Sequence, residues 1–541
     1  MTSQQWAVLL VCSVLFAVAW SDGASAYDLE THRQLSREAV LRAGVDQRLP
    51  SYGLTPGQPI RGRILSLLRG PLPPDEWIAW GARDEDIPFF RTLNHFYDPP
   101  HDRGLTVPLY SGTRAPDWAL EDTGPLDGQG HSYRDARDAF YAGLTLAGRG
   151  SRERELGHTF YAIGHVIHLI QDVSGPEHTR NDAHLPIGSQ KSFAEGYLER
   201  NLRKFTPSDA RIGVAGMPTV TVPRELWRNP AGTGIAQFTN ANFVSPDTNF
   251  TAAKTGATAE EYVSPVLDLG QRDTTPLEAC KDTEQPVPPA GSLTFFGNAM
   301  WDPVSPDPMN PTLLVNPRMT TYSLFDQYLE RQRKRLVFAL NCYTVDAAAK
   351  ILLPRAVSYS ASLLEYFFRG RPTAIFGDGT FRVVNRTSDA RRAEVMDGRF
   401  ELYRDDAAGE RQLLATWILR LDPDRTSGPL TVPFLPDGDP SRCVLVFRGG
   451  LGAETDGVAG QQLDRCPTAS TLEGPYVEVG LPAGSGAHSP GCPDGFWLYL
   501  VQLCCDPGTE PGYWNYCAPS PQGAIVACEN STPWWFVCSL A

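Results

Sequence analysis

The sequence predicts a multi-domain protein: a mainly α-helical N-terminal domain, a β-sandwich and a small disulfide-rich C-terminal module. Three observations support this order. Apolar residues recur at three- and four-residue spacing from residue 27 to about 200 and again over 324–370. Short alternating segments with frequent turn residues fill the region 374–475. Cysteines are concentrated near the C-terminus, and 541 residues suffice for more than one domain at roughly 100–200 residues each.

Residues 1–26 are predicted to be a signal peptide. The apolar stretch Trp6–Trp20 leads to Ala24-Ser25-Ala26, a small-residue cleavage sequence. We therefore expect cleavage after Ala26, a mature chain that begins at Tyr27, and a secreted or periplasmic protein. The alternative is an uncleaved anchor, because no Lys or Arg precedes the apolar stretch.

The helical domain is expected to cover residues 27–373. Glycines that can end a helix follow three of its periodic segments, at Gly44, Gly70 and Gly150. Between about 205 and 320 the chain is rich in Pro, Thr, Asn and Gly and predicts a long irregular insertion. The expected helices are 29–44, 60–70, 132–150, 153–173 and 324–370.

The C-terminal third is expected to contain two further domains. The β-sandwich is predicted over 374–475, with strands at 379–388, 398–406 and 443–450. Residues 476–541 form the Cys-rich module. Since eight cysteines lie between Cys443 and Cys538, an exported chain would use them in disulfides. The alternative, a zinc ribbon, needs paired CxxC motifs that the spacings do not repeat.

The formal net charge of −14 argues against a broad basic face for nucleic-acid backbone. It does not exclude a phosphodiester substrate held by metal ions, because bound divalent cations offset local carboxylates.

Residues 168–178, HLIQDVSGPEH, carry the strongest chemical signal. On a helix His168 and Asp172 face the same side and could present an imidazole and a carboxylate to one cation. Gly175-Pro176 then ends the helix and allows His178 to fold back. Taken alone this motif is weak, because polar pairs at helical spacing are common.

Further candidate ligands lie nearby in the sequence. Nine of the ten histidines precede residue 185, and the acidic segment 84–86 lies just upstream of His95. The other candidates are His32, Asp182, His184 and Glu195. His165 is expected to have a buried or supporting role, and His101 and His158 to be ordinary surface or helix-flank residues. Asn249 and Asn385 begin glycosylation sequons.

This set of residues resembles the zinc-dependent phospholipase C and fungal single-strand-specific nuclease superfamily. The best local matches are the segment HFYDP at 95–99 and the spacing of His168, Asp172 and His178. The resemblance covers about residues 27–200 and the returning helices up to about 370. It implies a helical phosphodiesterase with three zinc ions.

The resemblance also implies a ligand set. Tyr27, through its backbone amine and carbonyl, and His32 would hold one zinc, and Asp172 would bridge it to a second. His95, His168 and an acidic residue of 84–86 would complete the second site, with Asp86 preferred and Asp84 next. The family usually begins with Trp, so Tyr27 is a departure.

The third zinc site departs further from the family. The family expects His178 and then a second His four residues before an acidic residue, but Lys191 stands four residues before Glu195. We expect His184 to replace the missing ligand. Asp182, or an absent or weakened site, is the alternative.

The activity implied is attack of a zinc-activated water on phosphorus, with Asp86 or Asp84 assisting proton transfer. Phe96 and Asp98 would contact the substrate. We expect a phospholipid or another phosphodiester as substrate, with possible contact to a membrane surface. Nucleic acid would be bound only as a substrate, not as a lasting partner. The alternatives are a nuclease or phosphatase of the same superfamily, or a degenerate scaffold whose C-terminal modules bind a partner, which the change at Lys191 favours.

Overall fold

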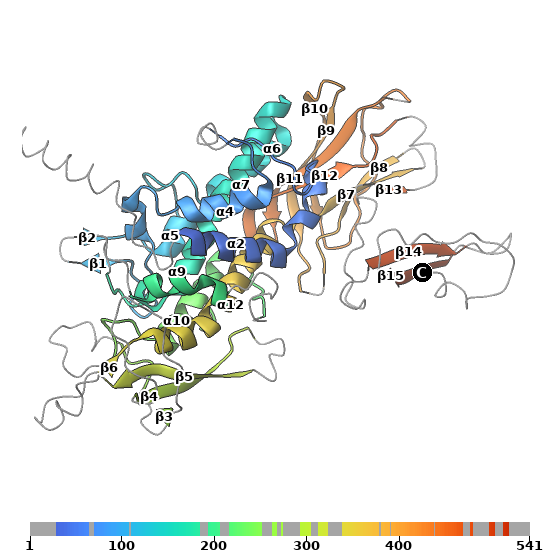
Figure 1. Cartoon of the computed structure of the whole chain (residues 1–541). Helices are drawn as coiled ribbons and strands as arrows, with labels where there is room; N and C mark the ends of the chain where they lie inside the picture. The colour runs from blue at the N-terminus through green and yellow to red at the C-terminus, as the bar shows by residue number, and fades with distance from the viewer. Residues whose placement is uncertain are drawn as a thin grey trace, which may run out of the picture. The chain divides into compact units, whose positions relative to one another are not determined.

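The protein combines helices with several antiparallel sheets (Figure 1). The computed structural model describes residues 29–63, 70–107, 110–183, 193–205, 216–250, 262–267, 272–273, 293–304, 312–322, 338–377, 380–389, 391–437, 439–468, 477–479, 497–503 and 512–518. The expected signal peptide, Tyr27, His184 and Lys191 lie outside these residues, and so does most of the C-terminal module. No helix in the described ranges is long and apolar enough to cross a membrane.

The helices occur mainly before residue 250. The α-helices are α2 (Leu29–Ala43), α4 (Pro74–Asp84), α5 (Ala115–Leu120), α6 (Tyr133–Thr145), α7 (Arg149–Asp172), α8 (Pro176–Thr179), α9 (Phe193–Phe205), α10 (Ile235–Asn242) and α12 (Cys342–Phe367). The 3₁₀ helices are η1 (Val45–Gln47), η2 (Leu49–Tyr52), η3 (Phe89–Asn94) and η4 (Pro223–Leu226).

The strands form five sheets in the described part of the chain. Before α12 the strands are β1 (Thr106–Val107), β2 (Tyr110–Ser111), β3 (Arg272–Asp273), β4 (Phe295–Trp301), β5 (Leu313–Tyr322) and β6 (Phe338–Ala339). After α12 they are β7 (Pro372–Gly377), β8 (Thr380–Asn385), β9 (Met396–Asp405), β10 (Arg411–Leu421), β11 (Arg442–Leu451), β12 (Glu454–Leu463), β13 (Val477–Val479), β14 (Trp497–Leu503) and β15 (Gly512–Ala518).

The chain divides into two compact units. The first comprises the described residues of Met1–Val45, Gly57–Phe140 and Glu153–Phe367. The second comprises those of Asp46–Pro56, Tyr141–Arg152 and Phe368–Ala541. The second unit therefore includes two segments from residues 27–373, the region assigned from the sequence to the mainly helical domain.

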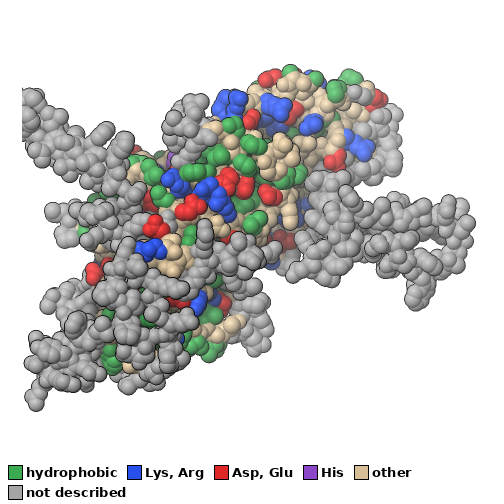
Figure 2. All heavy atoms as spheres, viewed as in Figure 1, with side chains coloured by type: hydrophobic (Ala, Val, Ile, Leu, Met, Phe, Trp, Pro, Cys, Tyr) green, Lys and Arg blue, Asp and Glu red, His purple; other side chains and the backbone are tan. Residues whose placement is uncertain are grey.

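In the first unit, α2 packs against both α4 and α12. Arg33 and Arg37 of α2 pair with Glu76 of α4 at 2.9 and 2.7 Å. On the face shown in Figure 2, basic and acidic side chains are interspersed in this way. The apolar side of α2, including Leu35 and Val40, is buried.

Two helix boundaries differ from the prediction. Gly44 follows α2 with a positive φ of 61°, as expected, but α6 ends at Thr145 and Gly150 lies inside α7. Of the helix expected over 60–70, residues 64–69 lie outside the described residues, and Ile60 pairs with Leu72 in an isolated antiparallel bridge. Of the helix expected over 324–370, residues 324–337 lie outside the described residues, Phe338–Ala339 is a strand, and the described helix runs from Cys342 to Phe367. The reason is local: the Asn341 side chain accepts hydrogen bonds from the backbone N–H groups of Tyr343 and Thr344, which caps the helix there.

The region 205–320 is not simply irregular. It contains η4, α10 and most of a sheet with strand order β3-β4-β5-β6. Its strands lack the strict alternation that reveals a strand in a sequence, since four consecutive residues of β4, Phe295–Asn298, are buried. The expectation of an irregular insertion was therefore wrong for this part.

The second unit contains a four-stranded sheet, β10-β9-β11-β12, and a three-stranded sheet, β13-β7-β8. Side chains from both sheets meet in one apolar core that includes Phe376, Phe381, Phe400 and Phe447. Cys443 of β11 forms a disulfide with Cys466. The predicted strands correspond to β8, β9 and β11, while β7, β10 and β12 were not foreseen.

Candidate metal centre

A close crossing of α4 and α7 positions the centre. A Cβ added to Gly81 would lie 2.0 Å from the Tyr161 carbonyl oxygen, and one added to Gly164 would lie 2.2 Å from that of Ile78. Only glycine allows two helix backbones to approach so closely. The C-terminal end of α4 is thereby held beside the last turns of α7.

Five predicted ligands converge near this crossing. His32 comes from α2, Asp86 follows α4, His95 follows η3, and His168 and Asp172 lie on α7. Potential ligand atoms of His32, Asp86 and His168 lie within 4.8 Å of one another, and so do those of His95, His168 and Asp172. We call these five residues the cluster; all are buried.

Asp172 lies at the centre of the cluster. Its Oδ1 is 3.3 Å from His32 Nε2, while its Oδ2 is 2.7 Å from His95 Nδ1 and 2.9 Å from His168 Nε2. The two oxygens thus face different imidazoles, as a carboxylate that bridges two cations requires.

The buried carboxylates fit a bound cation. None of the oxygens of Asp86 and Asp172 accepts an aligned hydrogen bond from the described residues. A buried carboxylate without hydrogen bonds or a counter-charge is costly. Imidazole and carboxylate groups are ligands that zinc takes in proteins, so the chemistry of this donor set suits a divalent metal.

Neighbouring groups orient two of the imidazoles. His32 Nδ1 lies 2.8 Å from Gln171 Oε1, and Gln171 in turn donates to Ser36 Oγ at 3.0 Å. His168 Nδ1 lies 2.5 Å from the Ala82 carbonyl oxygen, at the end of α4. Since each Nδ1 faces an acceptor, the Nε2 atoms face the cluster and present a lone pair to a cation when the rings are neutral.

The electrostatics also favour a cation. Burial has the largest single effect and would lower the pKa of His95 and His168. Asp172, together with Glu85 for His95 and Asp86 for His168, more than offsets burial and raises both pKa values, that of His168 well above its ordinary value. Burial alone would raise the pKa of Asp172, yet the adjacent imidazoles, His168 first, hold it well below its ordinary value. In the metal-free chain, protons therefore occupy the place of a cation.

His178 lies at the edge of the cluster, on α8. Its Nδ1 is 3.2 Å from the His95 carbonyl oxygen and 4.0 Å from Asp172 Oδ2. Its ring stacks on Phe96, with centroids 4.3 Å apart. Because Nδ1 faces a backbone acceptor, Nε2 is the atom that His178 could offer to a further cation.

The other expected ligands of a third site are less defined. His184 lies outside the described residues, and of Glu195 only the backbone, in α9, is described. Asp182 is buried and accepts a hydrogen bond from the Asp247 backbone at 2.7 Å.

Asp84 and Asp98 interact mainly with the protein itself. Asp84 accepts hydrogen bonds from Arg83 at 2.9 Å and from the Tyr161 hydroxyl at 3.0 Å, and it belongs to neither metal-capable group in the described residues. Asp98 Oδ2 lies 2.8–2.9 Å from donors on three residues, which are His101, Arg103 and Tyr262. Asp98 Oδ1 makes no hydrogen bond in the described residues.

The sequence did not reveal several supporting groups. Gln171 could have been suspected, because it lies three residues after His168 on the same helix. Glu85 is fully buried 3.5 Å from His95, but it could not be distinguished from its acidic neighbours. His158, expected at the surface or a helix flank, is buried within α7.

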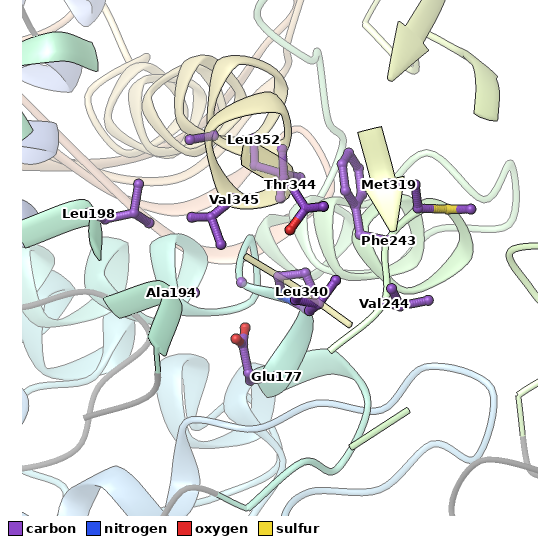
Figure 3. Close-up of a pocket in the computed structure, with 14 residues that line it drawn as sticks. Glu177, Ala194, Leu198, Phe243, Val244, Met319, Leu340, Thr344, Val345 and Leu352 are labelled. Atoms are coloured by element: carbon purple, nitrogen blue, oxygen red, sulfur yellow. The ribbon is translucent and has the colours of Figure 1, made fainter. Parts of the chain in front are cut away.

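An apolar pocket adjoins α8 (Figure 3). It encloses about 550 Å³ of empty space, including space open to solvent. Three of its lining residues, Gly175, Pro176 and Glu177, directly precede His178. The rest of the lining is mainly apolar and includes Leu198, Phe243, Met319, Val345 and Leu352.

Comparisons with known proteins do not add to this picture. No family model matches the chain, and no curated protein matches its sequence.

Proposed function

We propose that the protein is a zinc-dependent phosphodiester hydrolase of the phospholipase C type. The observation that carries the proposal is the convergence of His32, Asp86, His95, His168 and Asp172, with buried carboxylate oxygens that lack aligned hydrogen bonds. The order and spacing of these residues support it, since they resemble the zinc phospholipase C and nuclease superfamily.

The cluster would hold two zinc ions. Asp172 would bridge them, with His32 and the Tyr27 backbone on one side and Asp86, His95 and His168 on the other. His178 would contribute to a third. When bound, the zinc ions supply Lewis acidity that activates water and neutralises charge on a phosphoryl group.

The chain's own residues orient and enclose this chemistry. Gln171 and the Ala82 carbonyl hold the imidazoles of His32 and His168 with Nε2 inward. Asp86 is the better candidate for assisting proton transfer at its carboxylate oxygens, because both lack hydrogen bonds in the described chain whereas Asp84 is bonded to Arg83 and Tyr161.

A lipid substrate is favoured over nucleic acid. The apolar pocket lined by Gly175–Glu177, just before His178 in the chain, suits a substrate with an apolar part. The net charge of −14 disfavours a long polyanion. A single-strand nuclease remains the second candidate, because the segment 95–99 is shared by both branches of the superfamily.

We further propose that the chain is exported, with Tyr27 as its first residue after cleavage, and that its C-terminal part binds a surface or partner. The Cys443–Cys466 disulfide supports an oxidising compartment. The shared core of the two sheets supports a β-sandwich over 374–475.

The test is hydrolysis by the zinc-loaded mature protein. Phosphatidylcholine, single-stranded DNA, RNA and nitrophenyl mono- and diesters are offered side by side, and bound zinc is measured on the same sample. We expect release of a diglyceride and a phosphorylated headgroup. Preferential cleavage of DNA or RNA would favour the nuclease, and preference for the monoester a phosphatase. A folded protein that takes up no zinc would support the scaffold instead.

A further inference from the structure

We propose that Glu85 is a positioning residue of the metal centre. It fixes the His95 ring with a proton on Nε2, so that the lone pair of Nδ1 faces the cation. The inference rests on the proposed function only in taking the cluster to bind a metal.

His95 lies between acidic groups on both sides. Its Nδ1 faces the cluster, 2.7 Å from Asp172 Oδ2 and 3.5 Å from Asp86 Oδ1. Its Nε2 makes no aligned hydrogen bond with the described residues and lies 3.5 Å from Glu85 Oε1, a charged carboxylate oxygen. A neutral imidazole carries one ring proton. A carboxylate beside Nε2 favours the proton there and leaves Nδ1 as the ligand atom.

His95 is oriented differently from the other two imidazoles of the cluster. His32 and His168 turn Nε2 inward, and their Nδ1 atoms face neutral acceptors, the Gln171 amide oxygen and the Ala82 carbonyl. His95 alone turns Nδ1 inward, and its outer nitrogen faces a carboxylate. A charged acceptor makes an imidazole a stronger ligand than a neutral one does.

Glu85 is itself rigidly held as an anion. Its Oε2 accepts a hydrogen bond from Arg91 at 2.6 Å and contacts His165 Nδ1, and its Oε1 accepts one from the Trp118 indole at 2.8 Å. Arg91 is anchored in turn, because it donates to the carbonyl oxygens of Gly128 and Gln129, each at 2.9 Å. The carboxylate therefore cannot rotate away from His95 without losing these bonds.

The surrounding charges agree with this role. The guanidinium of Arg91, whose Nη2 lies 2.6 Å from Glu85 Oε2, is the counter-charge of this carboxylate. Burial lowers the pKa of His165 to about 4 and that of the stacked His131 to about 3, so both are neutral near pH 7.

A purely structural role is the competing explanation. Glu85 and Arg91 form a buried ion pair, and such pairs often only anchor a loop. Removing one partner would leave the other charge buried and destabilise the fold whatever happens at the metal. A test must therefore separate the loss of the ion pair from the loss of the carboxylate beside His95.

The experiment measures zinc affinity by competition with a chromogenic chelator, together with the melting temperature of the metal-free protein. The variants are Glu85→Gln and the double variant Glu85→Gln with Arg91→Met, which removes both charges and keeps the volume similar. Glu76→Gln is the control, because Glu76 on α4 also forms an ion pair, with Arg33 and Arg37, but lies away from the cluster. We expect Glu85→Gln to weaken zinc binding about 10–100-fold.

The double variant gives the decisive result. We expect it to recover stability relative to Glu85→Gln but to bind zinc as weakly. Recovery of the parent's zinc affinity would overturn the proposal, because Glu85 would then act only through Arg91. If the parent protein binds zinc but cleaves no phosphodiester, the proposed function is refuted, and the zinc affinities of the variants still decide the role of Glu85. A parent that binds no zinc overturns both.

Discussion

Replacement of Gly164 by Ala tests the crossing that positions the cluster. The new methyl carbon would lie 2.2 Å from the Ile78 carbonyl oxygen and 2.9 Å from both the Ala82 nitrogen and the Gly81 Cα. These are backbone atoms and cannot rotate aside. Non-bonded contacts to carbon need about 3.5 Å, so α4 and α7 must separate by roughly 1 Å.

The expected cost follows from this displacement. Overpacking of a buried site costs about 1–3 kcal/mol, and the backbone clash favours the upper end. Ala is a better helix former than Gly by about 1 kcal/mol, so the net loss should be about 2 kcal/mol. Asp86, which follows α4, would move relative to His168 on α7, and zinc binding should weaken as well.

The assay is thermal unfolding of the metal-free protein, together with zinc affinity from chelator competition. A loss of about 2 kcal/mol should lower the melting temperature by about 4 °C. Gly196→Ala is the matched control, because the nearest atom to its new Cβ is Arg200 Nη1, the mobile end of a side chain, at 3.2 Å. An unchanged melting temperature and zinc affinity in Gly164→Ala would refute the close crossing.

Four further predictions concern the cluster and the two glycosylation sequons. Asp172→Asn should abolish hydrolysis and remove more than one zinc per chain by metal analysis, whereas loss of a single ion would contradict the bridge. Because the pKa of His168 is raised in the fold, zinc uptake near neutral pH should release protons, seen by calorimetry in buffers of different ionisation enthalpy. The raised pKa also means that protonated His168 stabilises the metal-free fold. The melting temperature of the metal-free protein should therefore fall as the pH rises through the pKa of His168, and a melting temperature that does not change with pH would contradict this. Asn249 and Asn385 are buried, and the Asn385 amide donates to the carbonyl oxygens of Glu394 and Leu421, so mass spectrometry of folded protein from a glycosylating host should find no glycan at either residue.

The sequence predicted the local part of the site well. His168 and Asp172 lie one turn apart, and the fixed period of a helix determines their common direction. The convergence of His32, Asp86 and His95 on them is a tertiary property. It was expected only through the family resemblance, since no local pattern relates residues so far apart in the chain.

The choice among three consecutive acids shows where sequence reasoning stops. Asp84 is the last residue of α4, and Glu85, its C-cap, still has helical backbone angles, so the helix ends among these three acids. Asp84 bonds to Tyr161, Glu85 lies beside His95, and Asp86 faces the cluster. These directions depend on how the chain leaves α4 after its crossing with α7, which residue types alone do not specify.

The insertion was misjudged for a related reason. Strands buried on both faces do not alternate, and β4 and β5 contain buried runs of four and three consecutive residues. The spacing of apolar residues therefore reveals a helix or strand only where one of its faces is exposed to solvent.

The final turns of α7 combine two geometric requirements in one stretch of chain. Gly164 must face α4, and His168, Gln171 and Asp172 must face the cluster. One residue inserted or deleted between Gly164 and His168 would rotate everything after it by about 100° and remove all three from the site together. In natural variants of this chain, we therefore expect changes of length to accumulate in loops and to be excluded from this interval.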